Sequence, residues 1–165
     1  MGRFFSLVQI KNNGSREQFL KAFCDVMKKR SLVPCSEKES SVSYILAFSE
    51  SGKWVTLASK EYRDNPKQVK DDAKQTAAEM KTSSFSMDVV DSDWTYIELH
   101  TGADVHDTVM VGRSEFDEEH SPKGRRECWE PILAPGKTWE QISEIWNKNE
   151  VFVAVSYTHL RAHET

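Results

Sequence analysis

Residues 41–59 of the chain, SVSYILAFSESGKWVTLAS, predict a β-hairpin. Apolar side chains recur at every second position from Val42 to Phe48, which is the period of a strand with one buried face. The run from Trp54 to Leu57 is aromatic and β-branched, as strands favour. Gly52 supplies the backbone freedom for the reversal between them. A hairpin this apolar is not stable alone in water, so the flanking segments must cover it.

Regular patterns on both sides of the hairpin predict further strands and helices. Ser15 with Gln18, and Thr138 with Gln141, have the spacing of capping boxes, and Asn65 followed by Pro66 is a typical helix start. Strands are predicted over residues 3–10, 84–89, 94–99 and 105–111, and helices over residues 15–30, 65–80 and 138–146. Residues 112–127 are highly charged and predict a solvated loop.

The resulting order, β-α-β-β-α-β-β-β-α, predicts the α+β class: an antiparallel sheet with helices packed on one face. The first six elements match the ferredoxin-like, split βαβ arrangement. A division into paired βαββ halves is the alternative, and the pattern leaves the strand order open.

Composition limits the class of protein. With 165 residues, of which 38% are hydrophobic, the chain can build one core and is expected to form one domain. A net charge of -4 lacks the basic excess that nucleic-acid binding requires. No apolar run reaches the roughly 20 residues that span a bilayer, and no signal sequence is recognised. We therefore expect a cytoplasmic protein that binds neither nucleic acid nor membrane.

The end of the chain differs from the rest. Residues 155–165, VSYTHLRAHET, follow neither helical nor strand periodicity and resemble a translated sequencing-library adapter. Segments of such origin are excluded from fold prediction. The resemblance implies a metagenomic, bacterial source, a native domain over residues 1–153 that is truncated at its C-terminus, and an artefact tail over residues 154–165. His159 and His163 in the tail are therefore not interpreted as metal ligands.

The three cysteines lack the spacing of a metal or redox motif. We expect Cys24, Cys35 and Cys128 to be reduced and buried, with Cys24 on the inner stripe of the first helix. Cys128, beside Trp129, is the one candidate for a reactive thiol. Trp129 is also the tryptophan expected to be exposed if one of the late tryptophans is, because its neighbours are polar or loop-forming.

Several apparent motifs have simpler structural explanations. Gly136-Lys137-Thr138 resembles the end of a phosphate-binding loop, but the first glycine of that motif would fall at Pro131, so Thr138 is interpreted as a helix cap. Asp91 and Asp93 are typical of a turn. His100 and His106 would face opposite sides of a hairpin that turns at residues 102–103. The sequence therefore predicts no catalytic residue, no cofactor and no metal site.

Binding to another protein is the function that we predict first, and an enzyme is disfavoured. Small neutraliser or immunity-like proteins provide the analogy, which rests on fold class alone. The candidate contacts lie in and after the charged loop: Glu115, Asp117, Glu118, Glu119, Lys123, Arg125, Arg126 and Trp129.

A small-molecule sensor or small enzyme is the alternative. Its pocket would lie between the sheet and the helices. The candidate lining residues are Tyr44, Trp54 and Tyr96.

Overall fold

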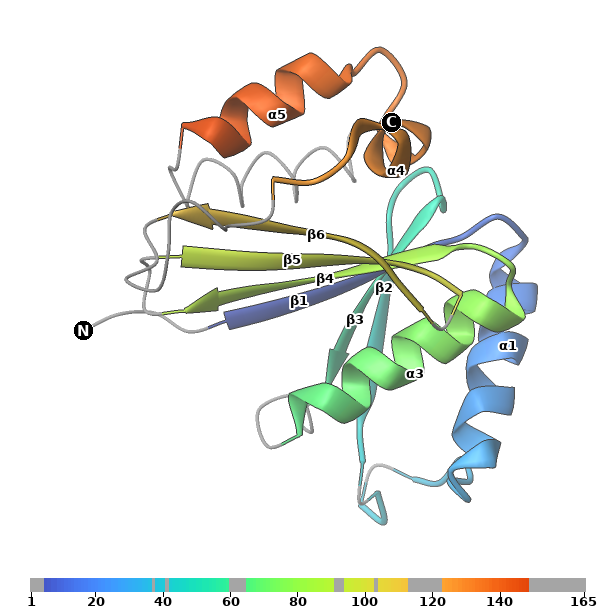
Figure 1. Ribbon diagram of the computed structural model, residues 1–165. Coiled ribbons are helices and arrows are strands. Elements are labelled where there is room, and N and C mark those ends of the chain that lie inside the picture. The colour runs from blue at the N-terminus through green and yellow to red at the C-terminus, as the bar shows by residue number, and fades with distance from the viewer. Residues whose placement is uncertain are drawn as a thin grey trace. The chain divides into compact units, whose positions relative to one another are not determined.

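The alternating and capped segments of the sequence form strands and helices close to the predicted positions. The computed structural model describes residues 5–36, 38–40, 42–59, 65–90, 94–102, 104–112 and 123–148. The strands are β1 (Phe5–Lys11), β2 (Tyr44–Phe48), β3 (Trp54–Ser59), β4 (Ser83–Val90), β5 (Trp94–Thr101) and β6 (Asp104–Gly112). The helices are α1 (Arg16–Lys29), α3 (Pro66–Glu79), α4 (Arg126–Trp129) and α5 (Trp139–Asn147), with a 3-10 turn, η1, at Glu130–Ile132. The predicted α+β class is confirmed (Figure 1).

The six strands form one antiparallel sheet in the order β2-β3-β1-β4-β5-β6. The first four strands in the chain are thus neighbours in the order β4-β1-β3-β2, which is the ferredoxin-like arrangement predicted for the first six elements. β5 and β6 continue the sheet beyond β4. One helix was not predicted: α4 begins at Arg126, inside the segment expected to be a solvated loop.

The chain divides into two compact units. The first, which we call the hairpin unit, comprises Leu7–Ser84 and His100–Asp104. The second, which we call the tryptophan unit, comprises Met1–Ser6, Phe85–Leu99 and Val105–Thr165.

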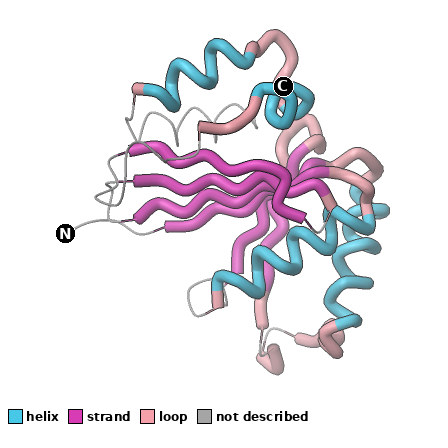
Figure 2. Tube along the Cα trace, viewed as in Figure 1, coloured by secondary structure: helices cyan, strands magenta, loops and turns pink. Residues whose placement is uncertain are grey.

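The hairpin unit is built on the predicted β2–β3 hairpin, whose two strands run side by side (Figure 2). The Gly52 N–H donates to the Ser49 carbonyl over 2.8 Å, and Gly52 adopts a φ of 69°, a conformation that glycine adopts without steric cost. In the register, Tyr44 pairs with Ser59 and Phe48 with Val55. Alternate residues of the two strands therefore face the core together.

Helices α1 and α3 pack against each other in this unit (Figure 1). Both capping predictions are confirmed, since Ser15 and Gln18 form a reciprocal capping box and the Asn65 side chain accepts from the Gln68 N–H. The core joins the two helices to β1 and β3, and its buried members are Val8, Ile10, Phe19, Phe23, Val55, Leu57, Val69, Ala73 and Ala77.

The tryptophan unit has a core of indoles packed edge to face. The Trp146 ring lies edge-on to Trp129, with centroids 5.1 Å apart, and edge-on to Trp139 at 5.8 Å. Trp129 and Trp146 are both buried, whereas Trp139 is half-buried. Trp139 is therefore the most exposed of the three and not Trp129, the one named for that case, because the Trp129 indole N–H donates to Asp107 over 2.8 Å and its ring packs inside the unit.

Candidate binding groove

A groove lies beside the C-terminal end of α1, within the hairpin unit. It has a volume of about 210 Å³ and a mostly apolar wall. We call it the α1 groove, and define it by its lining residues Phe23, Cys24, Met27, Lys28, Leu32, Val33, Pro34, Cys35, Val42 and Tyr44.

The chain forms this groove by turning at the end of α1. The helix ends at Lys29 with Arg30 as its C-cap, and Ser31 then adopts a φ of 59°, which turns the chain away from the helix direction. The Leu32 N–H donates to the Met27 carbonyl over 3.0 Å, and Leu32 to Cys35 line the groove together with Phe23, Cys24, Met27 and Lys28. The segment after α1 and the start of β2 thus supply the walls that α1 does not.

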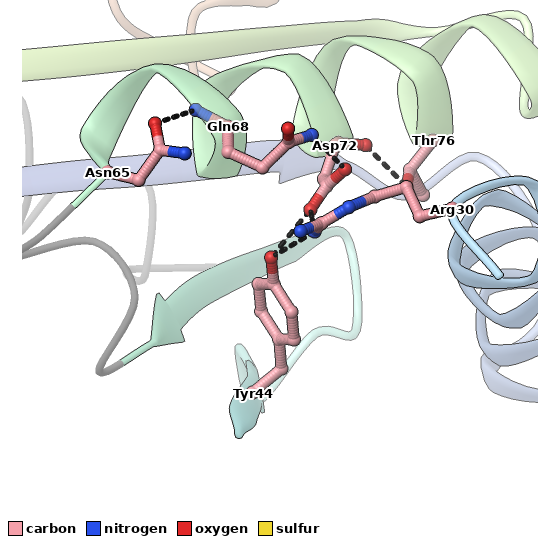
Figure 3. A network of polar contacts seen from close by, with 6 residues as sticks. All are labelled: Arg30, Tyr44, Asn65, Gln68, Asp72 and Thr76. Carbon is pink, nitrogen blue, oxygen red and sulfur yellow. Dashed lines mark hydrogen bonds and ion pairs between the residues drawn. The ribbon is translucent and has the colours of Figure 1, made fainter. Parts of the chain in front are cut away.

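The polar contacts behind the groove hold its tyrosine wall in place. The Tyr44 hydroxyl donates to the Asp72 carboxylate over 2.5 Å and accepts from the Arg30 guanidinium over 2.9 Å. Arg30 also forms an ion pair with Asp72, and the Gln68 side-chain amide donates to the same carboxylate over 3.1 Å. Figure 3 shows this network converging on Asp72 from α1, α3 and β2.

Asp72 is fully buried, with no exposed surface. Burial raises the pKa of its carboxyl group, and the hydrogen bond from Tyr44 and the charge of Arg30 oppose that shift. Three side chains, Arg30, Tyr44 and Gln68, donate to the carboxylate. We conclude that Asp72 positions Tyr44 and does not itself meet a ligand.

One basic side chain, Lys28, lines the groove and belongs to a small charged cluster on α1. Its ammonium lies 3.2 Å from the Asp25 carboxylate, which also contacts Lys21 at 2.7 Å. The hydrogen bond from Lys21, followed in size by that from Lys28, lowers the pKa of Asp25. One carboxylate thus faces two ammonium groups, which leaves the three side chains with a net positive charge.

The two thiols that line the groove contradict the prediction of buried cysteines. Cys24 and Cys35 are exposed, and only Cys128 is buried. Cys24 lies at the outer edge of the apolar stripe of α1, beyond Phe19, Phe23 and Val26, which face the core. Burial raises the pKa of Cys128, so the thiol that the sequence singled out for reactivity is the least available of the three.

The predicted protein contacts are only partly within the described residues. Glu115, Asp117, Glu118 and Glu119 lie outside them, as do Asp91, Asp93 and the tail. Lys123 pairs with Val109 in an isolated β-bridge. Arg125 donates to Asp107, and its neighbour Arg126 contacts Glu130 and Glu140. These last three contacts all lie inside the tryptophan unit.

Two residues of the alternative pocket, Tyr44 and Trp54, lie in the hairpin unit but on opposite faces of the hairpin. Tyr44 lines the α1 groove. Trp54 is buried but is not among the lining residues, because its neighbour Val55 faces the core with Tyr44 and Trp54 therefore points to the other face of the hairpin. Tyr96, on β5, is half-buried in the tryptophan unit.

Two of the candidate metal ligands, His100 and His106, are among the residues that the structure describes. His100 is buried, with 1% of its surface exposed, whereas His106 is exposed. Within the described ranges, no group of three or more histidine, cysteine, aspartate and glutamate side chains is placed to hold a metal ion. Thr138 is a helix cap, as predicted, and its side chain accepts from the Gln141 N–H.

Comparison with known proteins gives no family for this chain. No protein-family model matches the sequence, and neither a curated protein nor a solved structure is significantly similar to it. Among the helices of the described segments, none has both the length and the apolar character needed to cross a membrane.

Sequence reasoning missed most of the groove, but one signal of it was present. Val69, Asp72, Ala73 and Thr76 have the i, i+3, i+4, i+7 spacing of a buried helical face. A carboxylate on such a face needs a partner, which points to a buried ion pair. The partner, Arg30, is the last residue of the helix predicted over residues 15–30, where a cation is also typical of a helix end.

Proposed function

We propose that this chain is a non-enzymatic protein-binding module, and that the α1 groove receives an apolar side chain of its partner. The observation that carries this proposal is the combination of an apolar groove with an apolar residue, Val33, that lines it and is 75% exposed. Exposed apolar surface around a pocket is typical of interaction sites, where a buried anchor side chain contributes most of the affinity.

The exposure of Val33 favours a protein partner over a small molecule. A ligand that only fills about 210 Å³ would leave most of this side chain in water. A protein surface that inserts one side chain can cover Val33 and the neighbouring Pro34 and Cys35, which are also exposed, at the same time. Removing this apolar area from water is favourable, at roughly 25 cal/mol per Å².

The charge of Lys28 indicates what lies next to the anchor. Lys28, which lines the groove, shares the carboxylate of Asp25 with Lys21, and its side chain is 65% exposed, so it can also contact a partner. A carboxylate beside the anchor side chain would complement it and help to fix the orientation of binding. We therefore expect the partner segment to combine an aliphatic or aromatic residue with an adjacent aspartate or glutamate.

Selection from a random peptide display library on the immobilised chain tests this proposal. Enriched peptides are expected to share an apolar residue next to an acidic one. The Val33→Asp variant places a charge in the groove and should lose these peptides. Ile45→Asp is the matched control, because Ile45 is 66% exposed in the same unit but does not line the groove.

Three results would count against the proposal. Enriched peptides without the shared pattern, or peptides that bind both variants equally, would place the interaction elsewhere. A clear rise in melting temperature with small apolar molecules such as indole, lost in Val33→Asp, would instead support the small-molecule alternative. The charged loop that includes Glu115 and Glu119 stays a separate prediction, because it lies outside the described residues.

A further inference from the structure

Two of the three cysteines line the same groove. Cys24 is on α1, and Cys35 is on the segment that follows the helix. Both are exposed and neither is in a disulfide. Cys128, the third cysteine, is buried in the tryptophan unit and provides an internal reference.

Both exposed thiols belong to the wall of the same groove, one on the helix and one on the segment that follows it. The Leu32 N–H bonds to the Met27 carbonyl. Cys24 lies about one helical turn before Met27, and Cys35 follows Leu32 on the segment whose residues share the groove wall with Phe23, Cys24 and Met27. Residues 32–36 belong to no helix or strand, so this segment can adjust without breaking a regular element.

We propose that Cys24 and Cys35 form a reactive dithiol, which a low-molecular-weight disulfide such as glutathione disulfide oxidises to an intramolecular disulfide. Both thiols are accessible to such a reagent, which is the first requirement for exchange. The second requirement is that the two Cα atoms approach to about 4.4–6.8 Å, which the irregular segment around Cys35 can provide.

The reaction balances without a further reagent. One cysteine thiolate attacks a sulfur of glutathione disulfide, which forms a mixed disulfide and releases one glutathione thiolate. The other cysteine then attacks the protein sulfur of the mixed disulfide and releases the second glutathione. The two protein thiols lose two electrons, glutathione disulfide gains them, and the two thiol protons end on the two released glutathiones.

The disulfide would also regulate the groove, and this consequence rests on the proposed function. A bond from Cys24 to Cys35 joins two parts of the groove wall. It would draw the segment that carries Val33 and Pro34 onto the helix, and so narrow the space for an anchor side chain. The reduced chain is then the binding form, and the oxidised chain is not.

Mass spectrometry of the full chain tests the dithiol directly. The folded protein is treated with glutathione disulfide, free thiols are alkylated, and the disulfides are mapped. We expect the original chain to lose two hydrogen atoms and to carry no glutathione. C24S and C35S should each carry one glutathione at the remaining groove thiol, whereas C128S should behave as the original chain does.

Three results would overturn the proposal: separate glutathiones on Cys24 and Cys35, a disulfide between two chains, or no reaction at either thiol. Peptide binding is measured on the same samples. The oxidised original chain should no longer bind the selected peptides. The oxidised C128S variant should lose them as well. If the disulfide forms and the peptides stay bound, the dithiol stands and its control of the groove fails. If the reduced chain selects no peptides, the proposed function fails and mass spectrometry still decides the dithiol.

Discussion

At the level of single residues, the buried carboxylate of Asp72 has the largest expected effect on stability. It lies among three donors, and its removal would leave the Arg30 guanidinium, whose side chain is only 21% exposed, without this ion pair. Breaking such a pair costs more than forming it gains, because the remaining charge stays poorly solvated. We expect Asp72→Ala to lower the free energy of unfolding by about 3 kcal/mol, measured by urea denaturation.

The adjacent Asp71 is the matched control for this prediction. It lies on the same helix, its side chain is 37% exposed, and it contacts Lys74 at 3.7 Å. Asp71→Ala changes helix propensity in the same way but removes only a surface pair, which is typically worth less than about 1 kcal/mol. Equal losses in the two variants would show that the Asp72 network does not stabilise the fold.

The same residues show what a sequence can and cannot reveal at this scale. The position of Asp72 on the inner face of α3 follows from helical spacing. The contacts of Asp72 with Arg30 and Tyr44 do not follow from that spacing. Both residues lie on other elements, and the periodicity of one element does not determine how it packs on another. The prediction that Cys24 is buried was wrong for a related reason. Helical spacing placed Cys24 beside the stripe, and only the packing of α1 decided which edge faces water.

At the level of elements, the helix caps are the most predictable features. Spacing alone identified Ser15 with Gln18 and Thr138 with Gln141, because a capping box depends only on neighbouring residues. The order of the strands was left open for the opposite reason. Alternation indicates which face of a strand is buried, but it does not identify the neighbouring strand. The short helix α4 was hidden by the charge of the residues around it.

The cap of α1 gives a prediction for an element. Ser15→Ala removes the acceptor of the Gln18 N–H, a contact of 3.2 Å, and leaves that donor without its side-chain partner. We expect a loss of about 1 kcal/mol in the free energy of unfolding. Ser15→Thr retains the hydroxyl and should lose less than half as much. A similar loss in both variants would mean that the hydroxyl does not cap the helix.

The segment that leads into α4 gives a second prediction at the level of elements. Gly124 has a φ of 77°, and a Cβ atom there would lie 2.7 Å from Val109 Cγ2 and 3.3 Å from Trp146 Cζ3. Gly136 has nearly the same φ, 78°, but no atom within 4 Å of its Cβ position. We expect Gly136→Ala to cost about 1 kcal/mol from backbone strain alone, and Gly124→Ala to cost roughly 1–3 kcal/mol more.

The difference between the two glycine variants, measured by thermal or urea denaturation, isolates the effect of packing because the backbone strain is common to both. Equal losses would show that the tryptophan core can move aside for a methyl group. A loss of near-ultraviolet circular dichroism in Gly124→Ala, without one in Gly136→Ala, would place the damage among the indoles.

At the level of the whole molecule, the fold class followed from the sequence but the candidate site did not. Strand alternation and helix caps are local, and together they imply an antiparallel sheet with helices. The α1 groove depends on the turn of the chain at Ser31, whose positive φ no turn residue such as glycine announces. Of its lining residues, only Tyr44 was predicted as part of a pocket.

The stability of the whole molecule should fall as the pH drops below neutrality. Burial, together with the charges of Lys74 and Lys70, lowers the pKa of His100 from 6.5 to about 4. The unfolded chain therefore binds a proton near pH 6.5 that the folded chain does not bind until about pH 4. Stability is complete above pH 6.5 and is lost as the pH falls, by about 1.4 kcal/mol at most for each pH unit.

Urea denaturation at intervals between pH 7 and pH 5 measures this slope. Asp72 works in the opposite direction, since its pKa is raised and its protonation favours the folded chain. It cannot cause the loss, and it is retained in every variant compared. His100→Gln should flatten the pH dependence even if it lowers stability overall. His106→Gln changes an exposed histidine and should keep the original slope. A slope that persists in His100→Gln would mean that another group controls folding in this range.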